Sequence, residues 1–217
     1  MKNLFTAIRH NDLEKVKQLL EKNPALIACT AKQPPKKDDG QSPLQVALKT
    51  GNFDIAEYLL SLGADVTFME DEACCNEWRA PVLHDAITAA VMCSRWNVNS
   101  PIYGGLKVFS TREKADRAFD ILKKIIALGA DTNVKDSFGN SCLCRACLQA
   151  RQILPSYSHI HQKLHDNRIV TKELTADLAR IFKLLLKKGA DRDYIAPNFG
   201  RTLTEMYKNE PVARFLV

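Results

Sequence analysis

The sequence predicts an all-α solenoid, in which helical-hairpin repeats stack on one another. The tripeptide Gly-Ala-Asp occurs three times, at residues 63–65, 129–131 and 189–191. Each copy follows an apolar pattern of helical spacing that ends in two large aliphatic residues, namely Leu59-Leu60, Ile125-Ile126 and Leu185-Leu186. A short motif that recurs at the ends of predicted helices indicates a repeat architecture. Because stacked repeats build an extended surface, the pattern favours binding over catalysis.

The most complete repeat unit lies at residues 39–65. Pro43 suits the first turn of a helix, where its missing N–H group costs nothing. Ala47 is small at the point where two helices must approach each other. Gly51 ends this first helix, and Gly63 fits the left-handed position that follows a second helix. These residues predict a helix, a turn and a second helix.

This unit resembles the ankyrin repeat. The family pattern is a turn, a Thr-Pro-Leu-His-x-Ala-Ala helix, a Gly turn, and a second helix that ends Leu-Leu before Gly-Ala-Asp. The unit departs from the pattern at Ser42, Gln45 and Leu48, which replace Thr, His and Ala. The resemblance implies one domain over residues 1–217, with repeats at about 1–30, 39–70, 79–135, 136–195 and 196–217. We expect the first and last repeats to act as caps.

Repeats three and four are longer than the second. From the leucine of the first helix to the Gly of Gly-Ala-Asp, the distance is 19 residues for Leu44, but 46 for both Leu83 and Leu143. The equal excess predicts elongated helical hairpins over residues 83–128 and 143–188. Their second helices are expected to start near Thr111 and Thr171, with a capping box of Ser110 and Glu113. A plain loop insertion is the alternative, and a function for the insertions stays open.

Two turns between repeats are also long, and they differ in charge. The first is basic and contains Lys32, Lys36 and Lys37 beside a Pro-Pro pair. The second is acidic and contains Glu70, Asp71, Glu72 and Glu77. Attraction between such exposed charges contributes about 0–1 kcal/mol, so we expect little stabilisation from it.

The resemblance implies that the concave face, formed by the turns and the inner helices, binds another protein. Large aromatic residues occupy the position before the turn glycine in three repeats, and polar neighbours flank them. A further set of aromatics lies in the two long connections. The candidate partner-binding residues are Trp78, Arg79, Phe138, Asn140, Phe199 and Arg201 on the turns, with Trp96, Tyr103 and Tyr157 in the connections. Exposed apolar groups with a polar rim are typical of binding surfaces. Packing of these rings on neighbouring turns is the alternative.

Metal binding and catalysis are not expected. The grouped cysteines are followed by three histidines, which raises the question of a metal: Cys142, Cys144, Cys147, His159, His161 and His165. In the repeat pattern, however, Cys147 faces the core and Cys144 faces the turn, and no zinc-finger pair is present. His84 and Asp85 are sequence neighbours on a helix, so they do not face each other. No phosphate-binding Gly-rich loop and no Gly-x-Ser-x-Gly occurs. We therefore expect no enzyme activity and no cofactor.

Composition limits the remaining choices. The 217 residues are 46% hydrophobic and 26% charged, with a net charge of +6 and seven cysteines. No signal peptide and no apolar run long enough for a membrane span is evident, and an odd cysteine count favours a reducing cytoplasm. We expect a protein that is monomeric on its own and binds neither membranes nor nucleic acid. Because no appended domain is evident, an inhibitor or antitoxin (immunity-type) protein is our first hypothesis. A scaffold or host-directed effector is the alternative, and a nucleic-acid binder ranks third.

Overall fold

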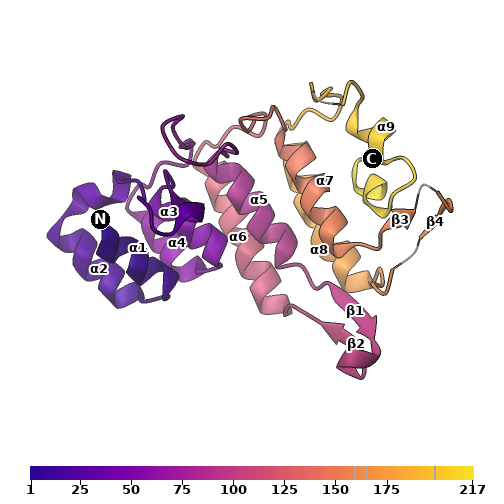
Figure 1. The fold of residues 1–217 in the computed structure, drawn as a ribbon, viewed down its shortest axis with the longest axis horizontal. Helices are drawn as coiled ribbons and strands as arrows, with labels where there is room; N and C mark the ends of the chain where they lie inside the picture. Colours follow the sequence, from indigo (N-terminus) through magenta and orange to yellow (C-terminus); the bar gives the residue numbers. More distant parts are fainter. Residues whose placement is uncertain (159, 165, 198) are drawn as a thin grey trace.

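The computed structural model describes residues 1–158, 160–164, 166–197 and 199–217, and these form a row of antiparallel helix pairs (Figure 1). The pairs are α1 (Lys2–Arg9) with α2 (Leu13–Lys22), α3 (Pro43–Thr50) with α4 (Phe53–Ser61), α5 (Val82–Met92) with α6 (Arg112–Ala127), and α7 (Cys142–Ile153) with α8 (Lys172–Lys187). A short helix, α9 (Leu203–Tyr207), and a 3-10 turn, η4 (Pro211–Phe215), close the C-terminal end. The architecture is mostly helical and repetitive, as the sequence predicts.

The first helices of successive pairs pack against one another and form the spine of the core. Each has a buried leucine near its first turn, namely Leu4, Leu44, Leu83 and Leu143, and α9 has Leu203; all are at most 1% exposed. The central helix α5 contacts α3, α6, α7 and α8, and most of its residues are buried. Removal of so much apolar surface from water at every repeat holds the stack together.

Local signals set the ends of these helices. At α3, the side chain of Ser42 accepts the N–H of Gln45, and the side chain of Gln45 accepts the N–H of Ser42. Gly63 has a φ of 82°, the left-handed conformation that Gly-Ala-Asp predicts at a helix end. At α6, the cap is Thr111, which accepts the N–H of Lys114 at 3.2 Å.

The predicted capping box of Ser110 and Glu113 is therefore wrong by one residue. The hydroxyl of Ser110 donates instead to the backbone carbonyl of Cys93. Since Cys93 ends α5, this bond ties the start of α6 to the end of its partner helix. Thr171 caps α8 in the same way as Thr111 caps α6, by accepting the N–H of Leu174 at 3.1 Å.

The long connections contain strands that the sequence analysis did not predict. Helices α6 and α8 have 16 residues each, whereas α4 has 9. Between α5 and α6, strands β1 (Asn97–Ser100) and β2 (Gly105–Val108) pair antiparallel around the turn η3 (Pro101–Tyr103). Between α7 and α8, β3 (Tyr157–Ser158) pairs with β4 (Lys163–Leu164). Figure 1 shows the β1–β2 hairpin extending beyond the ends of the helices.

Polar contacts join the β1–β2 connection to the following repeat. The N–H of Asn99 donates to the carbonyl of Asn167, and the side chain of Asn97 bonds both the N–H and the carbonyl of Ile169. The guanidinium of Arg95 forms a bidentate pair with Asp177, at 2.8 and 2.9 Å. The hairpin β1–β2 is thus held in place by the next repeat. Among the helices of the described residues, none has the length and apolar character needed to cross a membrane.

Candidate partner-binding face

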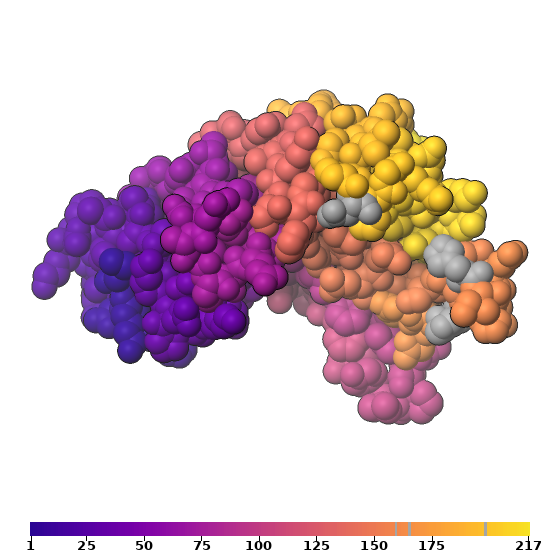
Figure 2. Space-filling model, turned by 45° about the horizontal axis from the view of Figure 1, so that its top comes forward, coloured from indigo at the N-terminus to yellow at the C-terminus, as the bar shows by residue number. Residues whose placement is uncertain are grey.

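Four turns join each helix pair to the next, and we call them fingers. They comprise residues 23–42, 62–81, 128–141 and 188–202, the last of which includes the undescribed residue 198. The first two contain the 3-10 turns η1 (Pro24–Ala28) and η2 (Lys36–Asp38), and an isolated bridge between Met69 and Pro81. Figure 2 turns the top of Figure 1 forward, toward the finger side of the stack. We call this side the finger face.

The inner helices α3 and α5 each contact the next finger through one polar side chain. The side-chain amide of Gln45 donates to the carbonyl of Ala80 at 2.8 Å, and Nε2 of His84 lies 3.2 Å from the carbonyl oxygen of Val134. These residues follow Leu44 and Leu83, where the ankyrin pattern has His. His84 is thus hydrogen-bonded to the next finger, as expected for the histidine that caps a turn in the ankyrin pattern.

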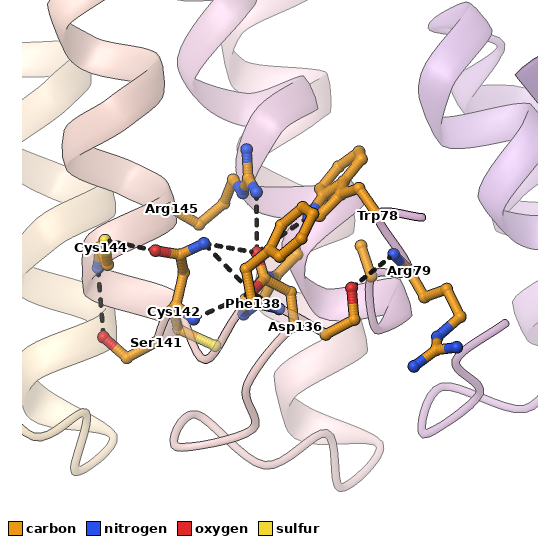
Figure 3. A network of polar contacts seen from close by, with 12 residues as sticks. Trp78, Arg79, Asp136, Phe138, Ser141, Cys142, Cys144 and Arg145 are labelled. Atoms are coloured by element: carbon orange, nitrogen blue, oxygen red, sulfur yellow. Dashed lines mark hydrogen bonds and ion pairs between the residues drawn. The ribbon is translucent and has the colours of Figure 1, made fainter. Parts of the chain in front are cut away.

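A buried carboxylate, Asp136, joins the second finger to the third (Figure 3). Its Oδ1 accepts the N–H groups of Phe138 and Asn140, at 3.0 and 2.9 Å. Its Oδ2 accepts the indole N–H of Trp78 at 2.9 Å and a guanidinium N–H of Arg145 at 3.0 Å. Burial alone would raise the pKa of Asp136, but the hydrogen bonds from Asn140, Trp78 and Arg145 outweigh it and lower the pKa.

This network corrects the expected position of Trp78. The sequence analysis placed it in a solvent-facing stripe, yet the ring is only partly exposed and its N–H is bonded to Asp136. The guanidinium carbon of Arg145 lies 4.4 Å from the ring centroid, and Nζ of Lys49 lies 5.5 Å away. The interaction could not be inferred from local sequence, because Asp136 is 58 residues away. One edge of Trp78 still borders the groove described below.

Two other candidates also make contacts within the protein, Arg79 to the neighbouring finger and Asn140 to the buried carboxylate of its own finger. Arg79 pairs with Ser137 through two bonds of 3.0 Å, and its guanidinium contacts Glu72 at 3.2 Å. The amide of Asn140 donates to both oxygens of Asp136. Like Trp78, these residues have contacts within the protein; the sequence analysis considered such packing for the aromatic rings and not for Arg79 and Asn140.

Phe138 and Phe199 remain half exposed, at 48% and 47%. Figure 3 shows Phe138 rising from the third finger toward Trp78. Phe199 and Arg201 border a shallow depression of about 360 Å³, which α9 and the end of α7 complete. The structure thus brings Phe199 and Arg201 together, and leaves their role in binding a prediction.

A groove of about 670 Å³ lies on the finger face between the first and second fingers. One wall is η2 of the first finger, the opposite wall is the second finger, and the last residues of α3 form the floor. Its lining residues are Lys36, Lys37, Asp38, Gln41, Lys49, Thr50, Cys75, Asn76, Glu77 and Trp78. The sequence analysis noted the charges of both fingers but did not predict this groove.

The walls of the groove are hydrogen-bonded to each other. The carboxylate of Asp39 accepts the N–H of Cys75 at 2.9 Å, and this bond is the main cause that lowers the pKa of Asp39. The side chain of Asn76 donates to the carbonyls of Lys36 and Asp39, at 3.4 and 3.2 Å. Backbone and amide groups, rather than Lys–Glu pairs, therefore hold the oppositely charged fingers together.

The aromatic residues of the β1–β2 connection largely stabilise that hairpin. Trp96 stacks on Phe109 with centroids 4.3 Å apart and planes 10° apart, and Tyr103 meets Phe109 edge-on at 5.6 Å. Nζ of Lys107 lies 4.6 Å from the centroid of Tyr103. Tyr103 is 46% exposed, whereas Trp96 packs against the core. Tyr157, in β3, is partly buried.

Sequence reasoning missed the most exposed apolar residues of this hairpin. Ile102, Leu106 and Val108 are 88%, 53% and 49% exposed. The available signal was the Gly104-Gly105 pair between two short strand-like runs, which is typical of a hairpin turn.

The neighbours His84 and Asp85 are both buried, and they contact different groups. Burial, assisted by Arg145, lowers the pKa of His84 to about 4. Burial raises the pKa of Asp85 to about 7, although Lys49, whose Nζ lies 3.8 Å from Oδ1, opposes the rise. Nδ1 of His84 and Oδ2 of Asp85 have no hydrogen-bond partner among the described residues. The two side chains are not bonded to each other and do not form an acid–base pair.

The cysteines of α7 are buried thiols. Cys142, Cys144 and Cys147 are fully buried, and Cys144 donates to Oδ1 of Asn140. Burial raises the pKa of Cys144 to about 11, so it stays protonated near neutral pH. Of the histidines in the metal hypothesis, His159 and His165 lie outside the described residues. Within the described ranges, no three His, Cys, Asp or Glu side chains converge as metal ligands.

Comparison with known proteins agrees with the repeat architecture. A search of curated proteins finds no significant match for the chain. The family model of ankyrin repeats, in three copies, matches residues 2–70. This segment contains α1 to α4 and most of the first two fingers, and the same stacking of helix pairs continues beyond it. Residues 2–70 are therefore ankyrin repeats.

Proposed function

We propose that the protein binds another protein through the finger face and has no catalytic role. Ankyrin repeats are generally protein–protein interaction modules. The observation that carries the proposal is the groove between the first two fingers, whose walls are fixed by Asp39, Cys75 and Asn76. Preformed walls lower the ordering cost of association. Trp78 at its edge belongs to the residue type most enriched at interface hot spots.

Within that function, we propose an inhibitor or antitoxin-type role, with a scaffold or effector as the alternative. A protein that occludes an enzyme benefits from two separate contact surfaces. The β1–β2 hairpin supports this idea, because Ile102, Leu106 and Val108 project apolar surface beyond the stack. A scaffold that uses only the finger face would tolerate replacement of residues 97–108 by a short Gly-Ser turn, whereas an occluding inhibitor would lose inhibition.

Nucleic-acid binding has weaker support. A basic stripe would be expected for contacts to a phosphate backbone. On the outer helix α6, Lys123 and Lys124 are paired with Asp120 and Glu57, at 3.1 and 3.4 Å. Their charge is thus partly compensated on the protein itself.

Affinity capture from the native lysate, followed by mass spectrometry, tests the binding function. Thr50→Arg places a bulky side chain in the groove, where the Thr50 hydroxyl bonds only to nearby groups of its own repeat. Ser61→Arg is the matched control, because the Ser61 hydroxyl likewise bonds its own helix, at the end of α4. We expect a stoichiometric partner that the wild type and Ser61→Arg retain and Thr50→Arg loses. Equal retention by both variants would exclude the groove as the binding site.

A further inference from the structure

The groove between the first and second fingers has positive charge on one wall and on its floor. Lys36 and Lys37 are exposed on the first finger and form no ion pair with any described residue. Lys49 rises from the floor at the end of α3. All three ammonium groups border the same depression, so their fields add within it.

The acidic residues near this wall are already engaged. Asp38 pairs with Arg9 at 2.8 Å, and Asp39 accepts the N–H groups of Cys75 and Gln33. On the opposite wall, Glu70 is buried and accepts the N–H of Ala80 at 2.8 Å.

The acidic second finger leaves one carboxylate for the groove. Glu72 pairs with Arg79, and the side chain of Asp71 accepts the N–H of Ala73. Glu77 lines the groove, forms no ion pair with any described residue, and is exposed to solvent on the wall opposite Lys36 and Lys37. The groove therefore has a basic wall and floor and a mainly polar opposite wall.

Lys49 is only partly neutralised by the protein. Its nearest carboxyl is that of Asp85, at 3.8 Å and buried beneath it. Because burial raises the pKa of Asp85 to about 7, that carboxyl is not fully charged near neutral pH. An anionic group that enters the groove can therefore form an ion pair with Lys49.

Close packing fixes the distance between the two walls. Gly40 has a φ of 81°, and a Cβ atom built on it would lie 2.5 Å from the Cβ of Cys74. The backbones of the two fingers thus approach as closely as a glycine permits. The groove of about 670 Å³ lies between the two fingers that this contact holds together, and an extended peptide is a kind of ligand that binds in such a groove.

We propose that this groove binds an extended acidic segment of the partner protein. Its carboxylates would face Lys36, Lys37 and Lys49, and the ring of Trp78 would pack on the aliphatic part of the segment. Gln41 lines the groove, and its Oε1 atom accepts no hydrogen bond from the described residues, so a peptide N–H would supply the missing donor. The inference rests on the proposed function and adds the chemistry of the partner. Three clustered lysines suit a short peptide better than the long phosphate track of a nucleic acid.

The test uses fluorescein-labelled peptides of alternating Glu and Ser, with Gln-Ser and Lys-Ser peptides and oligo-dT of similar length as comparison probes. Fluorescence anisotropy measures affinity for the full chain. The double variant Lys36→Glu/Lys37→Glu reverses the wall, and Lys183→Glu/Lys187→Glu makes the same change in net charge on the outer helix α8. All four lysines are exposed, so thermal melts of both variants should match the wild type.

We expect the Glu-Ser peptide to bind the wild type and to lose roughly tenfold or more in affinity with the wall variant, against less than about threefold with the α8 variant. Equal losses in the two variants would reduce the effect to general charge attraction and overturn the inference. Equal binding of the Gln-Ser peptide, or tighter binding of oligo-dT, would overturn it as well. If Thr50→Arg abolishes capture of the partner but Lys36→Glu/Lys37→Glu leaves it unchanged, the proposed function is supported and binding of an acidic segment is excluded. Indifference to both variants contradicts the proposed function itself.

Discussion

The two buried neighbours on α5 predict an unusual dependence of stability on pH. Burial raises the pKa of Asp85 from 3.8 to about 7, against the opposing charge of Lys49. Burial also lowers the pKa of His84 from 6.5 to about 4. Both shifts favour the neutral form in the folded state, but one group is an acid and the other a base. Their contributions to stability therefore change with pH in opposite directions.

The signs follow from the protons that each state binds. Between pH 4 and 7, Asp85 keeps its proton only in the folded protein, so stability falls as pH rises. Between pH 6.5 and 4, His84 takes up a proton only in the unfolded protein, so stability falls as pH falls. At about 1.36 kcal/mol for each pKa unit, the two effects amount to roughly 4 and 3 kcal/mol. The two pH dependences of stability nearly cancel between pH 4 and 6.5. From pH 6.5 to about pH 7, only the decrease in stability caused by Asp85 remains.

Replacement of Asp85 by Asn exposes the hidden contribution of His84. We expect urea unfolding to show that Asp85→Asn is more stable than the wild type at pH 8, by on the order of 2 kcal/mol or more, and similar to it at pH 4. Its stability should rise steeply between pH 4 and 6.5, where the wild type is nearly flat. His84→Gln should show the opposite slope. An Asp85→Asn variant whose stability runs parallel to that of the wild type at every pH would refute the reasoning.

Three further predictions concern the fingers. Asp136→Ala leaves Trp78, Asn140 and Arg145 without their buried acceptor. Chemical denaturation should therefore show that the free energy of unfolding falls by about 3–5 kcal/mol. The control Asp120→Ala, at an exposed residue, should lower it by less than about 1 kcal/mol. Gly40→Ala should destabilise the protein by more than Gly51→Ala, because both glycines have positive φ but only Gly40 has a neighbour within 4 Å, and equal losses would contradict close finger packing. Phe138→Ala and Phe199→Ala should each weaken partner binding by more than about 1 kcal/mol with little change in melting temperature, whereas a lower melting temperature with unchanged affinity would show that the rings are structural.

The repeat architecture was readable from sequence because its signals are local. Gly63 and its equivalents mark a backbone conformation that few other residues adopt, and Thr111 and Thr171 satisfy N–H groups only three residues away. Buried leucines such as Leu44 recur at fixed repeat positions for the same reason. Such features depend on short stretches of chain, and a single sequence records them directly.

The candidate site was less predictable because its geometry depends on distant pairs. Nothing near Trp78 indicates that its N–H bonds Asp136, and nothing near Gly40 indicates its close approach to Cys74 of the next finger. The same holds for Trp96, whose ring is covered by Phe109 from the far strand of an unpredicted hairpin. Aromatic residues in turns therefore indicated important positions, but not whether those positions face a partner or the neighbouring finger.

The most direct test of the account is amide hydrogen exchange of the protein, alone and in complex with its captured partner. The account predicts that the partner slows exchange in residues 31–42 and 70–80 and at the end of α3, which together form the groove. Exchange in the outer helices α2 and α4 should be unchanged, since they lie on the other side of the same repeats. Protection confined to the outer helices, with exchange in the first two fingers unaltered, would contradict binding through the finger face.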